Sequence, residues 1–173
     1  MNIDKIKPGE NPDKVNALIE IPYGSNIKYE IDKESGAVEV DRILFSAMYY
    51  PANYGFVPNT LAEDGDPADI LVINENPFQA GSVVRCRLIG ILVMEDEAGM
   101  DEKLVAVPIS KIDPTYDAIE SLEDLPKATL NKIKNFFETY KLLEPNKWVK
   151  VQDFKGKDAA QKMLQKAIDA YKK

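Results

Sequence analysis

The first third of the chain alternates between apolar and polar residues, and tight turns separate the alternating segments. This period of two predicts short β-strands over residues 15–21, 27–31 and 37–44. In the second of these strands, Lys28 and Glu30 share the face opposite the apolar one. Three short strands joined by tight turns are typical of a meander that begins a small barrel or sandwich.

The middle third combines ordered loops with longer apolar segments. Residues 48–58 are dense in aromatic residues and interrupted by Pro and Gly, which predicts an ordered loop with a brief strand. Buried strands are predicted over residues 70–73, 82–94 and 103–107. The last two form a hairpin, with the acidic residues 96–101 at its tip.

In the last third, the apolar period changes from two to between three and four. Beginning near Pro126, it predicts an amphipathic helix with an apolar side formed by Leu130, Ile133, Phe136, Phe137 and Tyr140. A second amphipathic helix is predicted over residues 157–172, with one side formed by Ala160, Met163, Leu164, Ala167 and Tyr171. Between the helices, residues 148–154 predict a closing strand, with Trp148 in the core.

Together these elements predict an α+β, mainly β fold: a small closed OB-like β-barrel with two amphipathic helices packed outside it. The length of 173 residues and the hydrophobic content of 45% fit a single domain over residues 1–173. The longest apolar run is far too short for a membrane span, and the first residues lack the apolar stretch of a signal peptide. We therefore expect a cytoplasmic protein without a membrane partner.

The histidine and cysteine counts narrow the possible catalytic mechanisms and metal sites. The chain has no histidine, and its one cysteine, Cys86, lies in a strand-like segment where a small core residue is expected. These counts exclude Ser-His-Asp and Cys-His catalysis, and ordinary zinc sites built on His or Cys. Any metal must be a hard cation that accepts oxygen ligands, such as magnesium, manganese or calcium.

The net charge narrows the classes of molecule that the protein can bind. Asp and Glu total 29 against 22 Lys and Arg, a net charge of -7, which disfavours nucleic acid as the main partner. A small anion can still bind an acidic protein through metal ions and a local cluster of Lys and Arg. A phosphate substrate therefore stays compatible with the composition.

The sequence Asp64-Gly65-Asp66-Pro67-Ala68-Asp69 places three carboxylates within six residues, just before an apolar strand. Gly and Pro between the aspartates predict a tight turn. Unless cations lie among them, carboxylates this close repel one another by on the order of a kcal/mol each. Taken alone, such a motif is also compatible with a solvated acidic turn.

Further polar residues lie on the predicted strands and ordered loops, and a closed barrel can bring them to one mouth. Besides the acidic turn, they are Glu20, Lys28, Glu30, Arg42, Tyr50, Tyr54, Asp96, Glu97, Asp101, Lys103, Tyr140 and Lys141. Carboxylates can hold several hard cations there, the cations neutralise a polyanion, and Lys, Arg and Tyr donate to its outer oxygens. Two metals that bridge a water lower its pKa and place it in line with phosphorus. Each residue by itself could instead be a solvated charge or a core residue.

Over nearly its whole length, the sequence resembles the soluble family I inorganic pyrophosphatases. The resemblance rests on residues 27–30 (IKYE), 50–55 (YPANYG), 64–69 (DGDPAD), 96–103 (DEAGMDEK) and 140–141 (YK), in the family's order. The acidic turn departs from the family signature at one position, where Ala68 replaces a larger aliphatic residue. Ala68 should face the packing beneath the turn.

The resemblance implies an inorganic diphosphatase, which hydrolyses pyrophosphate to two orthophosphates by in-line attack of a metal-bridged water or hydroxide. Several Mg2+ ions, for which Mn2+ is a substitute, would act as cofactors: a first held by Asp64, Asp69 and Asp101, a second touched by Asp69, and a third held by Asp96 with Asp101. Asp66 would be the general base, with Tyr54 close to the nucleophile. Family members of this length look like the short bacterial hexameric type, so the resemblance also implies a homohexamer.

The resemblance also implies the roles of the remaining residues. Those that bind phosphate oxygens would be Lys28, Arg42, Tyr54, Lys103, Tyr140 and Lys141. Those that act through water or an additional metal would be Glu20, Glu30, Glu97 and, in a supporting role, Tyr50.

Two other readings of the same residues remain open at this point. Haloacid-dehalogenase-like phosphatases also use a DxD motif, but there the apolar strand precedes the motif, whereas here it follows. The other reading is an OB-like binding module that buffers calcium or binds an oligonucleotide; the acidic net charge and the lack of a basic stripe disfavour an oligonucleotide.

Overall fold

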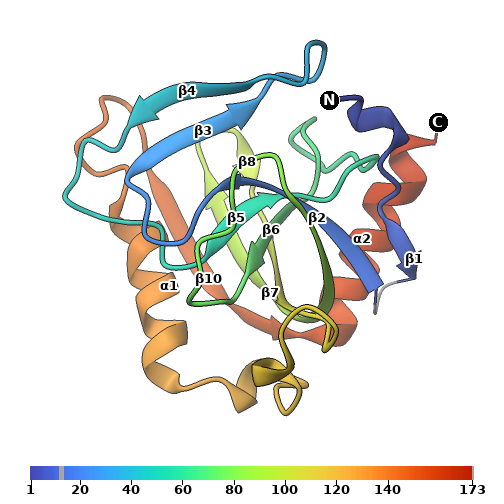
Figure 1. Ribbon diagram of the computed structural model, residues 1–173. Coiled ribbons are helices and arrows are strands. Elements are labelled where there is room, and N and C mark those ends of the chain that lie inside the picture. The colour runs from blue at the N-terminus through green and yellow to red at the C-terminus, as the bar shows by residue number, and fades with distance from the viewer. Residues whose placement is uncertain (12–13, 173) are drawn as a thin grey trace.

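A ring of five strands forms the centre of the molecule. The structure is a computed structural model that describes residues 1–11 and 14–172. Its ring contains, in order of pairing, β2 (Lys14–Ile21), β5 (Asn53–Phe56), β6 (Asp69–Val72), β9 (Lys103–Pro108) and β7 (Val83–Asp96). The first part of β7 pairs with β2 and so returns the sheet to its first strand. The predicted OB-like barrel is therefore confirmed, although shifts of register in β2 and β7 make the ring uneven (Figure 1).

Short strands extend this ring at its edges. The strand β1 (Gly9–Asn11) pairs with β2, while β8 (Gly99–Met100) and β10 (Val149–Gly156) pair with β7. All pairings in the sheet are antiparallel except that of β6 with β9, which is parallel. This parallel pair brings the end of the acidic turn beside the strand that follows the second acidic turn.

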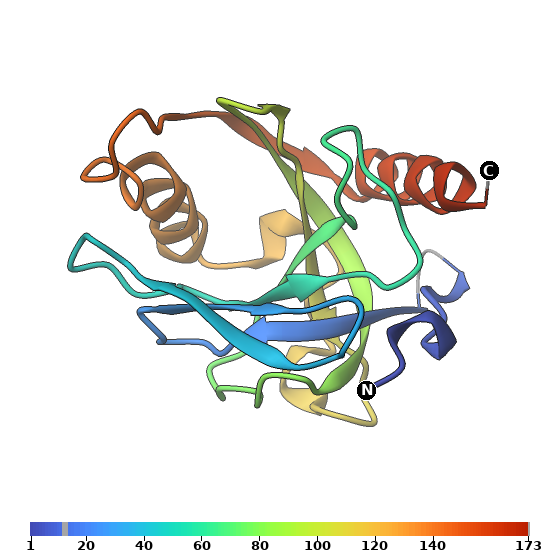
Figure 2. The same ribbon diagram turned by 90° about the horizontal axis from the view of Figure 1, so that it is seen from above.

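The predicted meander is wrong in one respect. Strands β3 (Ile27–Ile31) and β4 (Val38–Ile43) form a hairpin, but the hairpin is a separate two-stranded sheet and does not continue from β2. The edges of β2 are already hydrogen-bonded to β1, β5 and β7, so β3 has no free edge to join. The hairpin instead lies across the end of the barrel (Figures 1 and 2).

Two helices pack outside the barrel, as predicted. The helix α1 (Lys127–Thr139) buries Ile133, Phe136 and Phe137, and α2 (Lys157–Tyr171) buries Ala160, Leu164 and Ala167. The two helices lie on opposite sides of the curved sheet (Figure 2). Three short 3-10 helices complete the described elements, at Ile3–Lys5, Pro114–Tyr116 and Leu122–Asp124. Among the described helices, none has the length and apolarity needed to cross a membrane.

Two aromatic residues predicted to pack are exposed instead. Trp148 is 46% exposed because it lies in the irregular segment just before β10. Tyr171 is 47% exposed because α2 ends there and extends beyond the sheet. The prediction for Cys86 is confirmed, since its thiol is fully buried in the cluster beneath α2.

Candidate active site

The acidic turn is shaped by local hydrogen bonds. The Asp66 N–H donates to Asp64 Oδ1 at 3.0 Å, and the Ala62 N–H donates to the Asp66 carbonyl at 2.7 Å. Gly65 has φ +92°, a conformation that residues with a Cβ rarely adopt. Ala68 is fully buried beneath the turn, as expected, and its N–H donates to Thr60 Oγ1 at 2.9 Å. The turn thus points its aspartates away from the core.

These aspartates line a cavity of about 470 Å³ between the end of the barrel and the β3–β4 hairpin. All but one of the site residues predicted from the sequence line it: Glu20, Lys28, Glu30, Arg42, Tyr54, Asp64, Asp66, Asp69, Asp96, Glu97, Asp101, Lys103, Tyr140 and Lys141. The exception is Tyr50, which lies behind the cavity wall and is 2% exposed. Residues more than 100 positions apart in the sequence therefore converge, as the closed barrel required.

Lys103 lies at the floor of the cavity, between two carboxylates. The parallel register places Lys103 beside Asp69, and its ammonium forms ion pairs with both Asp69 and Asp101. Burial lowers the pKa of Lys103, but the two carboxylates outweigh it, so the pKa is raised and the ammonium stays charged. Burial raises the pKa of Asp101. The Lys103 ammonium lowers it by less, so the pKa stays above its ordinary value.

The β3–β4 hairpin supplies the roof. As predicted, Lys28 and Glu30 share one face and form an ion pair there. Lys28 also lies 3.0 Å from Asp41, and Asp41 forms a second ion pair with Arg42. The pKa of Asp41 is lowered because the hydrogen bond from Lys28 and the two positive charges outweigh the effect of burial. The roof therefore alternates positive and negative groups.

Glu20 projects from β2 toward this roof. Its carboxylate accepts a hydrogen bond from the Ile31 N–H at 2.9 Å, which ties the hairpin to the barrel. Burial is the main cause that raises the pKa of Glu20 to about 7. Near neutral pH, Glu20 is thus present in both its neutral and its charged form.

The second acidic turn contributes Asp96 and Glu97. Lys141, just after α1, donates to Asp96 Oδ2 at 2.8 Å, and Lys147 forms an ion pair with Glu97. Burial raises the pKa of Asp96, but the hydrogen bonds from Lys141 and from the Ala98 N–H reverse the shift and lower it. The carboxylate of Asp96 is therefore ionised at neutral pH.

An aromatic column connects the two sides of the cavity. The ring centroids lie 5.5 Å apart for Tyr54 and Tyr50, 4.7 Å for Tyr50 and Phe136, and 4.9 Å for Phe136 and Tyr140. Burial raises the pKa values of all three tyrosines above the ordinary value, so each phenol is a neutral hydrogen-bond donor at physiological pH. Tyr50 supports the column from behind.

Four charged residues of the site were missed by sequence reasoning. Lys33, in the turn of the hairpin, lies 2.9 Å from Asp66, and Lys147 pairs with Glu97 as described above. Asp41 and Glu144 hold Arg42. All four lie at exposed positions or in irregular segments, where charged residues are common. Their membership of the site is therefore visible only from the ion pairs they form across the fold.

The donor set fits hard divalent cations. Among the described residues, no three carboxylates are already arranged as a metal site. The carboxylates of Asp64, Asp69, Asp96 and Asp101 nevertheless face one cavity, and the shared ammonium of Lys103 marks a point where two of them already hold a positive charge. Oxygen donors of this kind suit Mg2+ or Mn2+. With Lys, Arg and Tyr donors around them, the arrangement can bind a phosphate-bearing anion together with its cations.

Comparison with known proteins agrees with this chemistry. Residues 17–172 match the inorganic pyrophosphatase family. The inorganic pyrophosphatase of Campylobacter jejuni is 72% identical over 172 residues, which cover 99% of this chain and 100% of the relative. The solved structure of the Helicobacter pylori inorganic pyrophosphatase has a TM-score of 0.95 and 61% identity, and the match covers 98% of this chain and 99% of that one. The Thermus thermophilus inorganic pyrophosphatase gives a TM-score of 0.95 at 43% identity, with 100% of both chains covered.

Proposed function

Because this chain belongs to the inorganic pyrophosphatase family and is thus a hydrolase, we propose that it cleaves pyrophosphate into two orthophosphates with Mg2+ as cofactor. The observation that carries the proposal is the single cavity into which both acidic turns and six basic side chains project. A cavity with this mixture of charges suits a polyanion that arrives with divalent cations.

The carboxylates hold the cations in this proposal. Asp64, Asp69 and Asp101 would hold the first, Asp69 would also contact a second, and Asp96 with Asp101 would hold a third. Bound Mg2+ supplies neutralisation of phosphate charge and a lowered pKa for water. Glu20, Glu30 and Glu97 complete the acidic lining and act through water or an additional ion.

The other side chains bind and orient the substrate. Asp66 accepts a proton from the attacking water, which forms a bond to one phosphorus as the bridging oxygen leaves with the other phosphate. Tyr54 lies beside that nucleophile. The donors to the phosphate oxygens are Lys28, Arg42, Lys103, Tyr140 and Lys141. In this structure Lys103 and Lys141 pair with carboxylates, and both lysines would be free to bind the substrate once those carboxylates hold cations instead.

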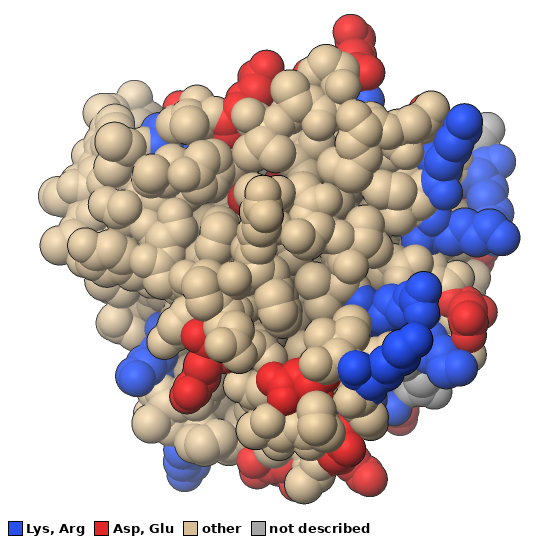
Figure 3. Space-filling view, viewed as in Figure 1, with Lys and Arg blue, Asp and Glu red and all other residues tan. Residues whose placement is uncertain are grey.

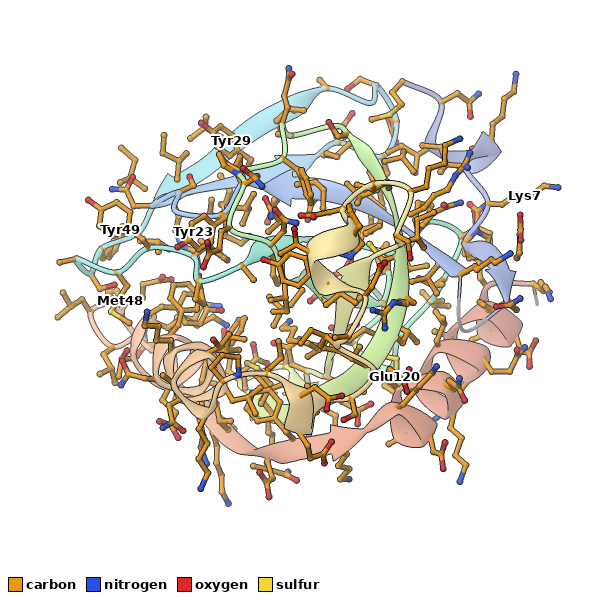
Figure 4. All side chains as sticks on the ribbon, turned by 60° about the horizontal axis from the view of Figure 1, so that its bottom comes forward. Lys7, Tyr23, Tyr29, Met48, Tyr49 and Glu120 are labelled. Carbon is orange, nitrogen blue, oxygen red and sulfur yellow. The ribbon has the colours of Figure 1, made fainter. Side chains whose placement is uncertain are left out.

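We also propose a homohexamer. Its support is a patch of exposed apolar side chains on the side where the β3–β4 hairpin and the end of α1 lie: Ile43, Phe45, Tyr49, Leu142 and Leu143. Charged residues are sparse on this side, and Lys and Arg gather on the opposite one (Figure 3). Tyr49, Tyr23 and Met48 lie on the same side, away from Lys7 (Figure 4).

The cytoplasmic location and the single-domain organisation stay predictions.

The first test is phosphate release by the purified chain. With Mg2+, we expect fast release from pyrophosphate, little from ATP or p-nitrophenyl phosphate, and none once a chelator is added. A folded protein that releases no phosphate with either Mg2+ or Mn2+ would contradict the proposal.

The role of Asp66 can be tested separately. We expect Asp66→Asn to lower turnover near neutral pH by about 100-fold or more, as is usual when a general base is removed. Affinity for Mg2+, measured by calorimetry, should change little, because Asp66 is not among the three carboxylates assigned to the first ion. Unchanged turnover would place the base elsewhere.

A further inference from the structure

Glu144 has no role in the reaction proposed above, yet its carboxylate is nearly buried at the edge of the cavity. Its side chain is 7% exposed, and its Oε1 lies 3.1 Å from Arg42 Nε. The two residues are 102 positions apart in the sequence. This ion pair connects the segment that follows α1 to the β3–β4 hairpin.

The backbone around Glu144 is held in place. The Glu144 N–H donates to the Lys141 carbonyl at 2.9 Å, which closes a turn. Pro145 follows and restricts the conformation of Glu144, and Asn146 has φ +60°, which reverses the chain again. Lys141 and Lys147, on either side, both bond to the second acidic turn. Glu144 therefore offers its carboxylate from a fixed position.

The guanidinium of Arg42 is held at two of its three nitrogens. Nε donates to Glu144, and Nη1 donates to Asp41. Within the described residues, Nη2 makes no hydrogen bond to a protein acceptor. A guanidinium is planar, so fixing two edges fixes the direction of the third. Arg42 lines the cavity, so the two N–H groups of Nη2, together with the one left on Nη1, are the donors available to an anion there.

We propose that Glu144 is a positioning residue that orients Arg42 so that its Nη2 edge meets a phosphate oxygen of the substrate. The proposal rests on the proposed pyrophosphatase function, since it assigns Arg42 to the substrate. Glu144 itself contacts neither the substrate nor the ions.

Glu144 has a second effect on anion binding, which acts in the opposite direction. The negative charge of Glu144 also reduces the positive potential of Arg42 in the cavity, so its removal by itself would strengthen anion binding. If orientation dominates, a variant that keeps the oxygen acceptor but loses the charge should behave nearly like the wild type. If neutralisation dominates, every variant that loses the charge should bind the anion more tightly.

The experiment compares Glu144→Ala and Glu144→Gln with Glu138→Ala, in which an exposed glutamate of α1 loses the same charge. We expect Glu144→Ala to raise KM for pyrophosphate about tenfold, the size of one lost charge-assisted hydrogen bond, with kcat within about twofold. Glu144→Gln should stay within about twofold of the wild type in KM, because its amide oxygen still accepts from Nε. Glu138→Ala should leave both constants unchanged. An unchanged or lowered KM in folded Glu144→Ala would overturn the proposal.

A second measurement does not depend on turnover. The chain has three arginines, so Nε–H resonances in a 15N-labelled sample are few, and Arg42→Lys identifies that of Arg42. Its Nε–H should exchange slowly with solvent in the wild type and in Glu144→Gln, and at least tenfold faster in Glu144→Ala, because the buried acceptor is lost. Equal exchange rates in all variants would overturn the positioning role.

A double variant checks that Glu144 acts through Arg42. In an Arg42→Ala background, the further change Glu144→Ala should not weaken binding of methylenediphosphonate, a non-hydrolysable analogue, measured by calorimetry. A full additional loss would overturn the proposal. If the wild type released no phosphate from pyrophosphate, the proposed function would fail, whereas the exchange rates would still decide whether Glu144 orients Arg42.

Discussion

Lys103 is a buried lysine, 4% exposed, whose charge is kept by two carboxylates, Asp69 on β6 and Asp101 between β8 and β9. A buried charge is tolerated only when it is paired, and removal of one partner leaves the others uncompensated. In this site the pairing is mutual, because Asp69 and Asp101 depend on Lys103 as much as it depends on them. A divalent cation could replace the lysine as their partner, whereas a neutral side chain could not.

We therefore expect Lys103→Met to lower the free energy of unfolding by about 3 kcal/mol in EDTA, the usual scale for a broken buried ion pair. Mg2+ should restore part of that loss, because it binds the two freed carboxylates in the folded state alone. Urea denaturation with EDTA and with Mg2+ measures both values. Lys150→Met, at an exposed lysine of β10, is the control. An equal deficit in the two conditions would show that the carboxylates do not take up the ion.

Glu20 gives a dependence of stability on pH. Its pKa is about 7 in the folded state, against 4.5 for an ordinary glutamate. A raised carboxyl pKa means that the folded state holds its proton more tightly, so the stability it contributes is complete below pH 4.5 and is lost as the pH rises through 7.

We expect Glu20→Gln, which does not titrate and can still accept from the Ile31 N–H, to avoid this loss. In EDTA, its advantage over the wild type in free energy of unfolding should be near zero at pH 4 and about 2 to 3 kcal/mol at pH 8. Denaturation curves at a series of pH values measure the difference. An advantage that is constant over pH would contradict the raised pKa.

At the scale of elements, Gly55 shows how closely the barrel strands approach. It lies in β5 directly after Tyr54, and a Cβ at this position would lie 2.0 Å from the Leu18 carbonyl oxygen of β2. The clash is with backbone, so no side-chain rotation can relieve it. The position of Tyr54 in the cavity thus depends on a glycine that faces the other way.

Gly55→Ala should accordingly lower the free energy of unfolding by about 3 kcal/mol, at the upper end of overpacking effects, and lower turnover as Tyr54 shifts. Gly156→Ala is the matched control, since a Cβ there meets nothing within 4 Å and the backbone φ is -68°; its cost should stay at about 1 kcal/mol or less, the scale of replacing the N-cap residue of α2 by alanine. Denaturation midpoints and phosphate release measure both effects. An unchanged midpoint in Gly55→Ala would show that β2 and β5 can separate without cost.

Periodicity predicted the strands and helices of the barrel because their packed faces are determined by neighbouring residues in the sequence. Periodicity failed where residues far apart in the sequence determine which strands pair. The strand β3 does not pair with β2, because β5 and β7, from later in the chain, are hydrogen-bonded to the edges of β2. Trp148 was misplaced because hydrophobicity alone does not show that the chain turns outward there. The resemblance supplied most cavity residues, whereas Lys33, Lys147, Asp41 and Glu144 required the pairing of charges across the fold.

At the scale of the whole molecule, the isolated chain leaves a patch of apolar side chains exposed to solvent. Its members are Ile43, Phe45, Tyr49, Leu142 and Leu143, all more than half exposed. The loop after β4 and the segment after α1 lie on one side in both ribbon views (Figures 1 and 2). Exposed apolar side chains that gather on one side of a molecule are typical of a protein interface.

We expect light scattering to give the mass of six chains for the wild type. Phe45→Asp should shift the mass toward smaller species, because it places a charge in the proposed interface. Ile112→Asp, which adds the same charge at another exposed apolar residue, is the control and should stay hexameric. A monomer in the wild type would contradict the hexamer.

The pairing of charges inside the cavity affects the protein between rounds of catalysis. Eight acidic and six basic side chains line it, and Lys28, Lys33, Lys103, Lys141 and Lys147 each contact at least one of the carboxylates. In the proposed reaction, the ammonium groups of Lys103 and Lys141 would give up their carboxylate partners to the arriving ions and would pair with them again when the ions leave. Most of the acidic groups would therefore keep a positively charged partner after the products depart.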